Sequence, residues 1–246
     1  MPTMPSQTNA HIARLAVPHG AILFDRACVP QADARLLDPQ AWGDACGALE
    51  GRGGRGAVWH IRAPFGEAVL RHYRRGGLPG RFVQDRYLFT GDEATRGFRE
   101  FRLLVRLREL GLPVPQPLAA GFVRSGLFYR ADLLTARIPE ARTLAERGRE
   151  SVPEATWRDL GELLARFHCH GVFHADLNAH NVMIGDAGAL WLIDFDRGEL
   201  RQPARNWQQA NLDRLHRSLE KLRIAGRDSG WPVLCEAYGA AMRITP

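Results

Sequence analysis

Three oxygen-bearing side chains stand at fixed spacing in the second half of the chain. Asp176 and Asn181 belong to the pattern His-x-Asp-x-x-x-x-Asn, and Asp194 opens an Asp-Phe-Asp triplet that follows an apolar run. A carboxylate can orient a hydroxyl and accept its proton, and Mg²⁺ prefers hard oxygen ligands. The pattern therefore predicts phosphoryl transfer, with Asp176 as the base and with Asn181 and Asp194 as metal ligands.

A turn without chemistry is the competing interpretation of these motifs. Asp and Asn gather in turns because their side chains bond to nearby backbone groups, and either motif alone is common by chance. Two apolar segments, residues 182–184 and 190–193, flank a turn at residues 185–188, which predicts a hairpin between the motifs. Both motifs in this order around a hairpin favour the catalytic interpretation. His174 is expected to brace the loop.

A glycine-rich segment and an arginine occur earlier in the chain. Gly51, Gly53, Gly54 and Gly56 precede a predicted strand, and glycine lets backbone amides approach phosphates closely. We predict that these glycines contact a nucleotide, with a flexible turn as the alternative. The segment is no Walker A motif, because Gly-Lys-Ser/Thr does not follow it.

Arg71 lies on the next predicted strand, at the position where kinases place a lysine. Arginine keeps the positive charge and can grip a phosphate through two hydrogen bonds, so Arg71 is predicted to bind phosphate and assist catalysis. Glu100, on a predicted helix over residues 95–110, is the expected partner of Arg71. A solvent-facing helix glutamate is the alternative interpretation.

Composition indicates a globular protein with a basic surface. The chain has 246 residues, 45% hydrophobic and 24% charged, and a formal net charge of +6. It has no apolar run near the roughly 18 residues of a membrane span, and no secretory signal is expected. The charge favours anionic partners. The sequence lacks the pattern of aromatic and basic residues that is typical of nucleic-acid binding. The four scattered cysteines are expected to be reduced thiols in a cytosolic protein.

The order of the predicted elements indicates an α+β fold with two lobes. The N-terminal lobe, residues 1–137, would hold a mainly antiparallel sheet and one main helix, and the mostly helical C-terminal lobe would be residues 138–246. Residues 1–20 are expected to be an irregular leader, and residues 135–139 a hinge. The expected strands are residues 21–24, 57–61, 67–73, 118–122 and 127–134, and the expected helices are residues 95–110, 157–170, 205–223 and 231–243.

The strings that carry these features resemble a known family. They are VLRHYRRGGL (residues 69–78), DRY (85–87), GLPVP (111–115), HADLNAHN (174–181) and WLIDFDRG (191–198). The set resembles the protein-kinase-like superfamily and, within it, the 3-deoxy-D-manno-octulosonic acid (Kdo) kinases of Gram-negative bacteria. The resemblance covers roughly residues 48–200 and includes the arginine at position 71.

The resemblance implies an enzyme of lipopolysaccharide core assembly that uses ATP and Mg²⁺. It would phosphorylate the 4-hydroxyl of a Kdo sugar on a lipid A precursor, in peripheral contact with lipid at the cytoplasmic face of the inner membrane. It would need neither nucleic acid nor an obligate protein partner. The candidate contacts to the carboxylate and phosphates of the acceptor are Arg74, Arg75, Arg81, Arg86 and Arg197.

Two alternatives remain open on the motifs. One is a kinase of the same superfamily with another acceptor, such as heptose, an aminoglycoside or a protein. The other is a nucleotide-binding module without catalysis. Whether Asp196 also binds metal is left open.

Overall fold

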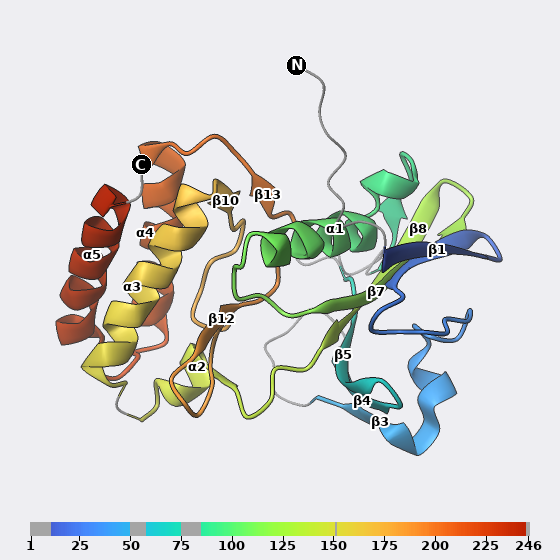
Figure 1. Cartoon of the computed structure of the whole chain (residues 1–246), viewed down its shortest axis with the longest axis horizontal. Helices are drawn as coiled ribbons and strands as arrows, with labels where there is room; N and C mark the ends of the chain where they lie inside the picture. The colour runs from blue at the N-terminus through green and yellow to red at the C-terminus, as the bar shows by residue number, and fades with distance from the viewer. Residues whose placement is uncertain (1–10, 50–57, 75–84, 151, 245–246) are drawn as a thin grey trace. The chain divides into compact units, whose positions relative to one another are not determined.

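The computed structural model describes residues 11–49, 58–74, 85–150 and 152–244, which form two compact units (Figure 1). The first unit contains the described residues up to Glu109 and the segment Gln116–Arg137, and the second contains Leu110–Pro115 and the described residues from Ile138 onward. The first unit holds an antiparallel sheet with one long helix, and the second holds most of the helices, which confirms the predicted α+β class.

An eight-stranded sheet forms the first unit, with the order β1-β2-β7-β8-β5-β4-β3 and with β6 paired to β8. Every pairing in it is antiparallel. The strands are β1 (Ile12–Val17), β2 (Gly20–Asp25), β3 (Cys46–Ala48), β4 (Val58–Ala63), β5 (Gly66–His72), β6 (Tyr87–Leu88), β7 (Pro117–Ser125) and β8 (Phe128–Ala136).

The strand β1 corrects the expectation that residues 1–20 are irregular. It forms a hairpin with β2, in which Val17 is paired with Gly20, and His19 in the turn has a positive φ of 60°. A two-residue hairpin turn commonly requires positive φ, usually from glycine or asparagine. A histidine in that place gave no turn signal in the sequence, so the strand before it was missed.

Helix α1 (Arg96–Glu109) packs on β7 and β8, as Figure 1 shows. Its inward face buries Phe98, Phe101, Leu104 and Leu107, which recur at helical spacing. Phe98 meets Phe122 of β7 edge to face, with ring centroids 5.3 Å apart. Glu100 lies on the same buried side of the helix, so its carboxylate needs a partner within the protein.

The second unit is built around helices α3 (Glu154–Cys169), α4 (Arg205–Lys221) and α5 (Arg227–Ile244), with α3 and α5 packed along each other. Gly161 permits this close approach, because a Cβ there would lie 2.3 Å from the carbonyl oxygen of Leu234. The remaining elements are α2 (Leu144–Arg147), β9 (Arg142–Thr143), β10 (Val172–Phe173), β11 (Val182–Ile184), β12 (Leu190–Leu192) and β13 (Glu199–Leu200).

The predicted hairpin between the two motifs is confirmed. Strands β11 and β12 pair antiparallel, with Met183 opposite Trp191. The segment Leu110–Pro115 belongs to this unit through backbone contacts: the Leu192 N–H donates to the Pro113 carbonyl at 3.1 Å, and the Arg166 guanidinium donates to the Gly111 carbonyl at 3.0 Å. Among the described residues, no helix combines the length and apolarity needed to cross a bilayer. All four cysteines are free thiols.

A buried histidine joins the three long helices of the second unit. His168 of α3 is 1% exposed, its Nδ1 lies 2.8 Å from the Tyr238 hydroxyl of α5, and its ring meets Trp207 of α4 edge to face. Burial lowers the pKa of His168 to about 4 and raises the pKa of Tyr238 to about 12. The imidazole is therefore neutral at physiological pH, and its Nδ1 shares a hydrogen bond with the Tyr238 hydroxyl.

The depressed pKa of His168 predicts that acid destabilises the protein over a defined range. An unfolded histidine binds a proton below its ordinary pKa of 6.5, whereas folded His168 stays neutral until about pH 4. Neutral His168 therefore contributes to the free energy of unfolding. The contribution, up to about 3 kcal/mol, is complete above pH 6.5 and is lost as the pH falls toward 4. Urea unfolding of the wild type and of His168→Gln, at pH values from about 7 to about 4.5, checks it. The variant should show the shallower loss, and equal slopes would contradict the assignment.

Candidate active site

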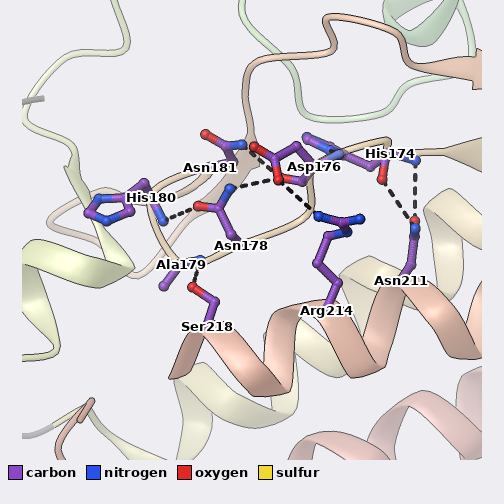
Figure 2. A network of polar contacts seen from close by, with 9 residues as sticks. All are labelled: His174, Asp176, Asn178, Ala179, His180, Asn181, Asn211, Arg214 and Ser218. Carbon is purple, nitrogen blue, oxygen red and sulfur yellow. Dashed lines mark hydrogen bonds and ion pairs between the residues drawn. The ribbon is translucent and has the colours of Figure 1, made fainter. Parts of the chain in front are cut away.

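The loop of residues 174–181 connects β10 to β11 and is ordered around one carbonyl group (Figure 2). The Asp176 carbonyl accepts hydrogen bonds from Nδ2 of Asn181, at 2.8 Å, and from Nδ2 of Asn178, at 2.9 Å. The Oδ1 of Asn178 in turn accepts the His180 N–H at 2.9 Å. These side-chain amides fix the backbone of Asp176, while its own carboxylate remains half exposed.

His174 ties this loop to the segment that carries Asp194. Its ring is buried, its Nε2 lies 3.0 Å from the Ile193 carbonyl, and its Nδ1 accepts the Asp176 N–H at 3.2 Å. These contacts define a neutral imidazole with its proton on Nε2. Burial lowers the pKa of His174, although the nearby carboxylates of Asp194 and Asp176 act in the opposite direction. The ring therefore braces the loop, as expected.

Asp194 directly follows Ile193, whose backbone is hydrogen-bonded to the loop. The Ile193 N–H donates to the Asn181 carbonyl at 3.0 Å, and Asp194 itself has a left-handed φ of 64°. Aspartate is among the few residues that adopt this conformation at modest cost. Phe195 then enters the core, where it stacks on Phe167 with ring centroids 6.1 Å apart. The structure thus brings Asp176 and Asn181 together. Asp194 is the residue after Ile193, which is hydrogen-bonded to Asn181.

Asn181 and Asp194 have side-chain oxygens of the type that Mg²⁺ prefers. The Nδ2 of Asn181 is used on the Asp176 carbonyl, which leaves its Oδ1 as the acceptor for a cation. Within the described residues, no group of three His, Cys, Asp or Glu is arranged to hold a metal. The protein would then supply only part of the coordination shell, as is usual for Mg²⁺ bound together with nucleotide phosphates and water.

Helix α4 supports the loop with a row of polar side chains that the sequence did not identify as part of the site (Figure 2). Asn211 makes two hydrogen bonds to the His174 backbone, one to each polar group, at 3.2 and 3.1 Å. The Ser218 hydroxyl accepts the Ala179 N–H at 3.1 Å, and the Arg214 guanidinium donates to the Asp176 carboxylate at 3.3 Å. Their spacing of three and four residues places the three on one helix face, and that polar row was the available signal.

Arg71 and Glu100 form an ion pair within the first unit. Glu100 is 3% exposed, which removes the solvent-facing alternative. Tyr73 completes the cluster: its hydroxyl donates to the Glu100 carboxylate at 2.6 Å and accepts from Arg71 at 3.2 Å. The Arg71 guanidinium also lies 4.7 Å from the centroid of the Tyr73 ring. Sequence reasoning missed Tyr73, whose contribution depends on two residues from different elements.

The remaining predicted residues divide by position. Gly51, Gly53, Gly54 and Gly56 lie outside the described residues, and so do Arg75 and Arg81. Arg74 and Arg86 are exposed in the first unit, and Arg197 is exposed in the second. Their contacts with an acceptor stay a prediction.

A loop with an ordered carboxylate and amide, followed by a braced Asp-Phe-Asp segment, is the arrangement of a kinase. Residues 39–238 match the lipopolysaccharide kinase (Kdo/WaaP) family. The match extends over most of the chain, and the chain belongs to this family.

Relatives with high identity span nearly the same length. A protein of Xanthomonas campestris pv. campestris (strain B100) is 54% identical over 205 residues, which cover 83% of this chain and 82% of the relative. One of Xanthomonas oryzae pv. oryzae (strain PXO99A) is 52% identical over 212 residues, 86% and 84% of the two chains. One of Stenotrophomonas maltophilia (strain R551-3) is 54% identical over 204 residues, 83% and 82%. Each is named 3-deoxy-D-manno-octulosonic acid kinase. The chain is therefore an ATP-dependent sugar kinase.

The cluster around Arg71 predicts a specific effect of removing one hydroxyl. Tyr73→Phe keeps the ring but deletes the hydroxyl that bonds both members of the Arg71–Glu100 ion pair, and a hydrogen bond to a charged group contributes about 1.5–3 kcal/mol. We expect the KM for ATP to rise about tenfold or more in steady-state assays. Arg71→Lys should be more damaging, because an ammonium group cannot contact both partners and also stack. Tyr129→Phe, another buried tyrosine of the sheet, is the control. An unchanged KM in Tyr73→Phe would show that the hydroxyl is dispensable.

The anchoring of the loop by α4 predicts a loss of turnover from a residue that touches no substrate. Asn211→Ala leaves the polar backbone groups of His174 without their side-chain partner, at about 1–3 kcal/mol for each buried group left unpaired. We expect kcat to fall while the KM for ATP changes little, and amide exchange to accelerate at residues 174–176. The exposed Gln209→Ala on the same helix should change neither quantity. Unaltered amide exchange in Asn211→Ala would contradict the anchoring role.

Proposed function

We propose that this kinase transfers the γ-phosphoryl group of ATP to the 4-hydroxyl of a Kdo sugar on a lipid A precursor, during lipopolysaccharide core assembly. The observation that carries the proposal is the identity of 52–54%, over more than four-fifths of the chain, with proteins named 3-deoxy-D-manno-octulosonic acid kinase. Asp176 supports it, because its backbone is held by the loop amides, its carboxylate is half exposed, and an alcohol acceptor needs such a group.

The reaction replaces one phosphorus–oxygen bond with another. The oxygen of the sugar hydroxyl bonds to the γ-phosphorus, the bond from that phosphorus to the bridging oxygen of ADP breaks, and the hydroxyl proton passes to the Asp176 carboxylate. The backbone of Asp176 is held by the two amides and by the His174 ring, so the carboxylate is oriented before the acceptor binds. Catalysis then depends mainly on positioning and charge neutralisation.

Asn181 and Asp194 would hold Mg²⁺ through their side-chain oxygens. When bound, the ion supplies positive charge that neutralises the phosphates. Arg71, held by Glu100 and Tyr73, would bind the nucleotide phosphates. The backbone of the glycines at 51, 53, 54 and 56 would contact the same phosphates. We assign residues 1–137 to the N-terminal lobe and residues 138–246 to the C-terminal lobe.

The acceptor carries a lipid, so we propose that the protein works at the cytoplasmic face of the inner membrane as a peripheral protein. The net charge of +6 supports attraction to an anionic surface, where each arginine contributes about 1 kcal/mol. Exposed Arg74, Arg86 and Arg197 are proposed to meet the lipid phosphates. No nucleic acid and no obligate protein partner enter this proposal.

The test is to incubate the protein with Mg-ATP and a Kdo-bearing lipid A precursor and to follow the acceptor by mass spectrometry. We expect one added phosphate, on the 4-hydroxyl of the sugar. A panel with heptose, aminoglycoside and protein acceptors separates the alternative kinases. Nucleotide binding without transfer to any acceptor would indicate a non-catalytic module.

Asp176→Asn predicts a large loss confined to the chemical step. The amide cannot take the hydroxyl proton, and general base catalysis contributes about 10²–10⁴-fold. We expect kcat to fall by that order while nucleotide binding, measured by calorimetry, stays close to the wild type. The control is Asp186→Asn, an exposed aspartate in the hairpin turn that is paired with Arg147. Near-normal turnover in Asp176→Asn would refute the role of Asp176.

A further inference from the structure

Arg214 is the positively charged side chain that touches the proposed base. One of its terminal nitrogens lies 3.3 Å from Oδ1 of Asp176, and both side chains are about half exposed, at 48% and 52% (Figure 2). Arginine has five N–H donors in a planar fork, and the Asp176 carboxylate is the partner of one of them. Among the described residues no other group accepts a hydrogen bond from Arg214, so its remaining donors are available to a ligand.

The contact between Arg214 and Asp176 contributes little to the stability of the loop. Exposed ion pairs stabilise proteins by about 0–1 kcal/mol. The loop is already fastened to α4 on both sides of this contact, by Asn211 at His174 and by Ser218 at Ala179. These flanking bonds fix the position of the helix turn that carries Arg214. The arginine is therefore a positioned, solvent-accessible cation beside the carboxylate that must receive the acceptor hydroxyl.

The chemistry of the acceptor fits such a cation. The relatives are named for a sugar acid, and a sugar acid differs from a neutral sugar by its carboxylate. In the ring form of this sugar the carboxylate is borne by the carbon two ring positions from the one with the 4-hydroxyl. A guanidinium is the side chain best suited to bind a carboxylate through two parallel hydrogen bonds. A sugar whose hydroxyl lies on Asp176 thus has its acid group within the neighbourhood of Arg214.

We propose that Arg214 binds the carboxylate of the acceptor sugar and thereby selects a sugar acid over a neutral sugar. This inference rests on the proposed function and extends it from the reaction to its specificity. Oδ1 of Asp176 stays with Arg214, and its other carboxylate oxygen receives the hydroxyl proton. The residue is not among the arginines nominated from the sequence, because its place beside Asp176 is created by the packing of α4.

Two other roles for Arg214 make different predictions. An arginine that only orients Asp176 would affect every acceptor equally. An arginine that holds the γ-phosphoryl group would also affect every acceptor equally, and its loss would slow the hydrolysis of ATP by water when no acceptor is present. The effect of losing Arg214 differs between acceptors with and without a carboxylate only if Arg214 binds that carboxylate.

The test compares two acceptors: the Kdo-bearing lipid A precursor and the same molecule with its sugar carboxylate converted to a carboxamide. The proteins are the wild type, Arg214→Gln and, as the matched control, Arg217→Gln, which removes an exposed arginine three residues further along α4. We expect wild-type kcat/KM to favour the acid by about 10–100-fold, because the acid alone offers a charge-assisted contact. Arg214→Gln should lose this preference because its kcat/KM falls much further on the acid than on the carboxamide, and Arg217→Gln should retain it.

Each result has a distinct meaning. If Arg214→Gln slows equally on both acceptors, the proposal is wrong and Arg214 acts on Asp176; a parallel fall in acceptor-free ATP hydrolysis would instead assign it to the phosphoryl group. If wild-type protein phosphorylates neither acceptor, the proposed function itself fails. Arg214→Lys is the second variant: a single ammonium should recover part of the preference, which a role confined to folding would not produce. Thermal unfolding of each variant confirms that it is folded.

Discussion

One buried, neutral imidazole holds the two halves of the candidate site in register. His174 accepts from the Asp176 backbone on one ring nitrogen and donates to the Ile193 carbonyl with the other, so both of its hydrogen-bonding groups are used within the protein. A protonated ring could not accept the Asp176 N–H, and burial keeps the ring neutral. The same side chain thereby holds both the segment with the proposed base, Asp176, and the segment with the proposed metal ligand, Asp194.

Helix α4 is the platform on which this arrangement is built. Its inner face contributes Asn211 and Ser218 to the loop, and its own position is fixed by the contact of Trp207 with His168. The apolar and polar contacts of the helix therefore have different tasks. The apolar contacts set the position of the helix among its neighbours, and the polar contacts hold the loop against the helix.

The sequence predicted what depends on neighbours in the chain. The hairpin of β11 and β12 and the helix α1 both had local signals, namely turn residues and helical spacing. The pairing of Arg71 with Glu100 was also foreseen, because the two residues hold typical positions in a known arrangement. Contacts made by residues far apart in sequence were not foreseen. Asn211 and Arg214 meet residues 37 and 38 positions away. The polar row marks one face of α4, but it does not specify which segment that face contacts.

The burial of Glu100 makes the position of α1 on the sheet costly to change. A swing of α1 away from the sheet would separate Glu100 from Arg71 and Tyr73, and would bring the apolar face of the helix into water. The large aromatic and aliphatic side chains on that face make such an opened state costly. Displacement of this helix from the sheet is therefore disfavoured. The contacts of Arg71 with Glu100 and Tyr73 are therefore kept in place by the packing of α1 on the sheet.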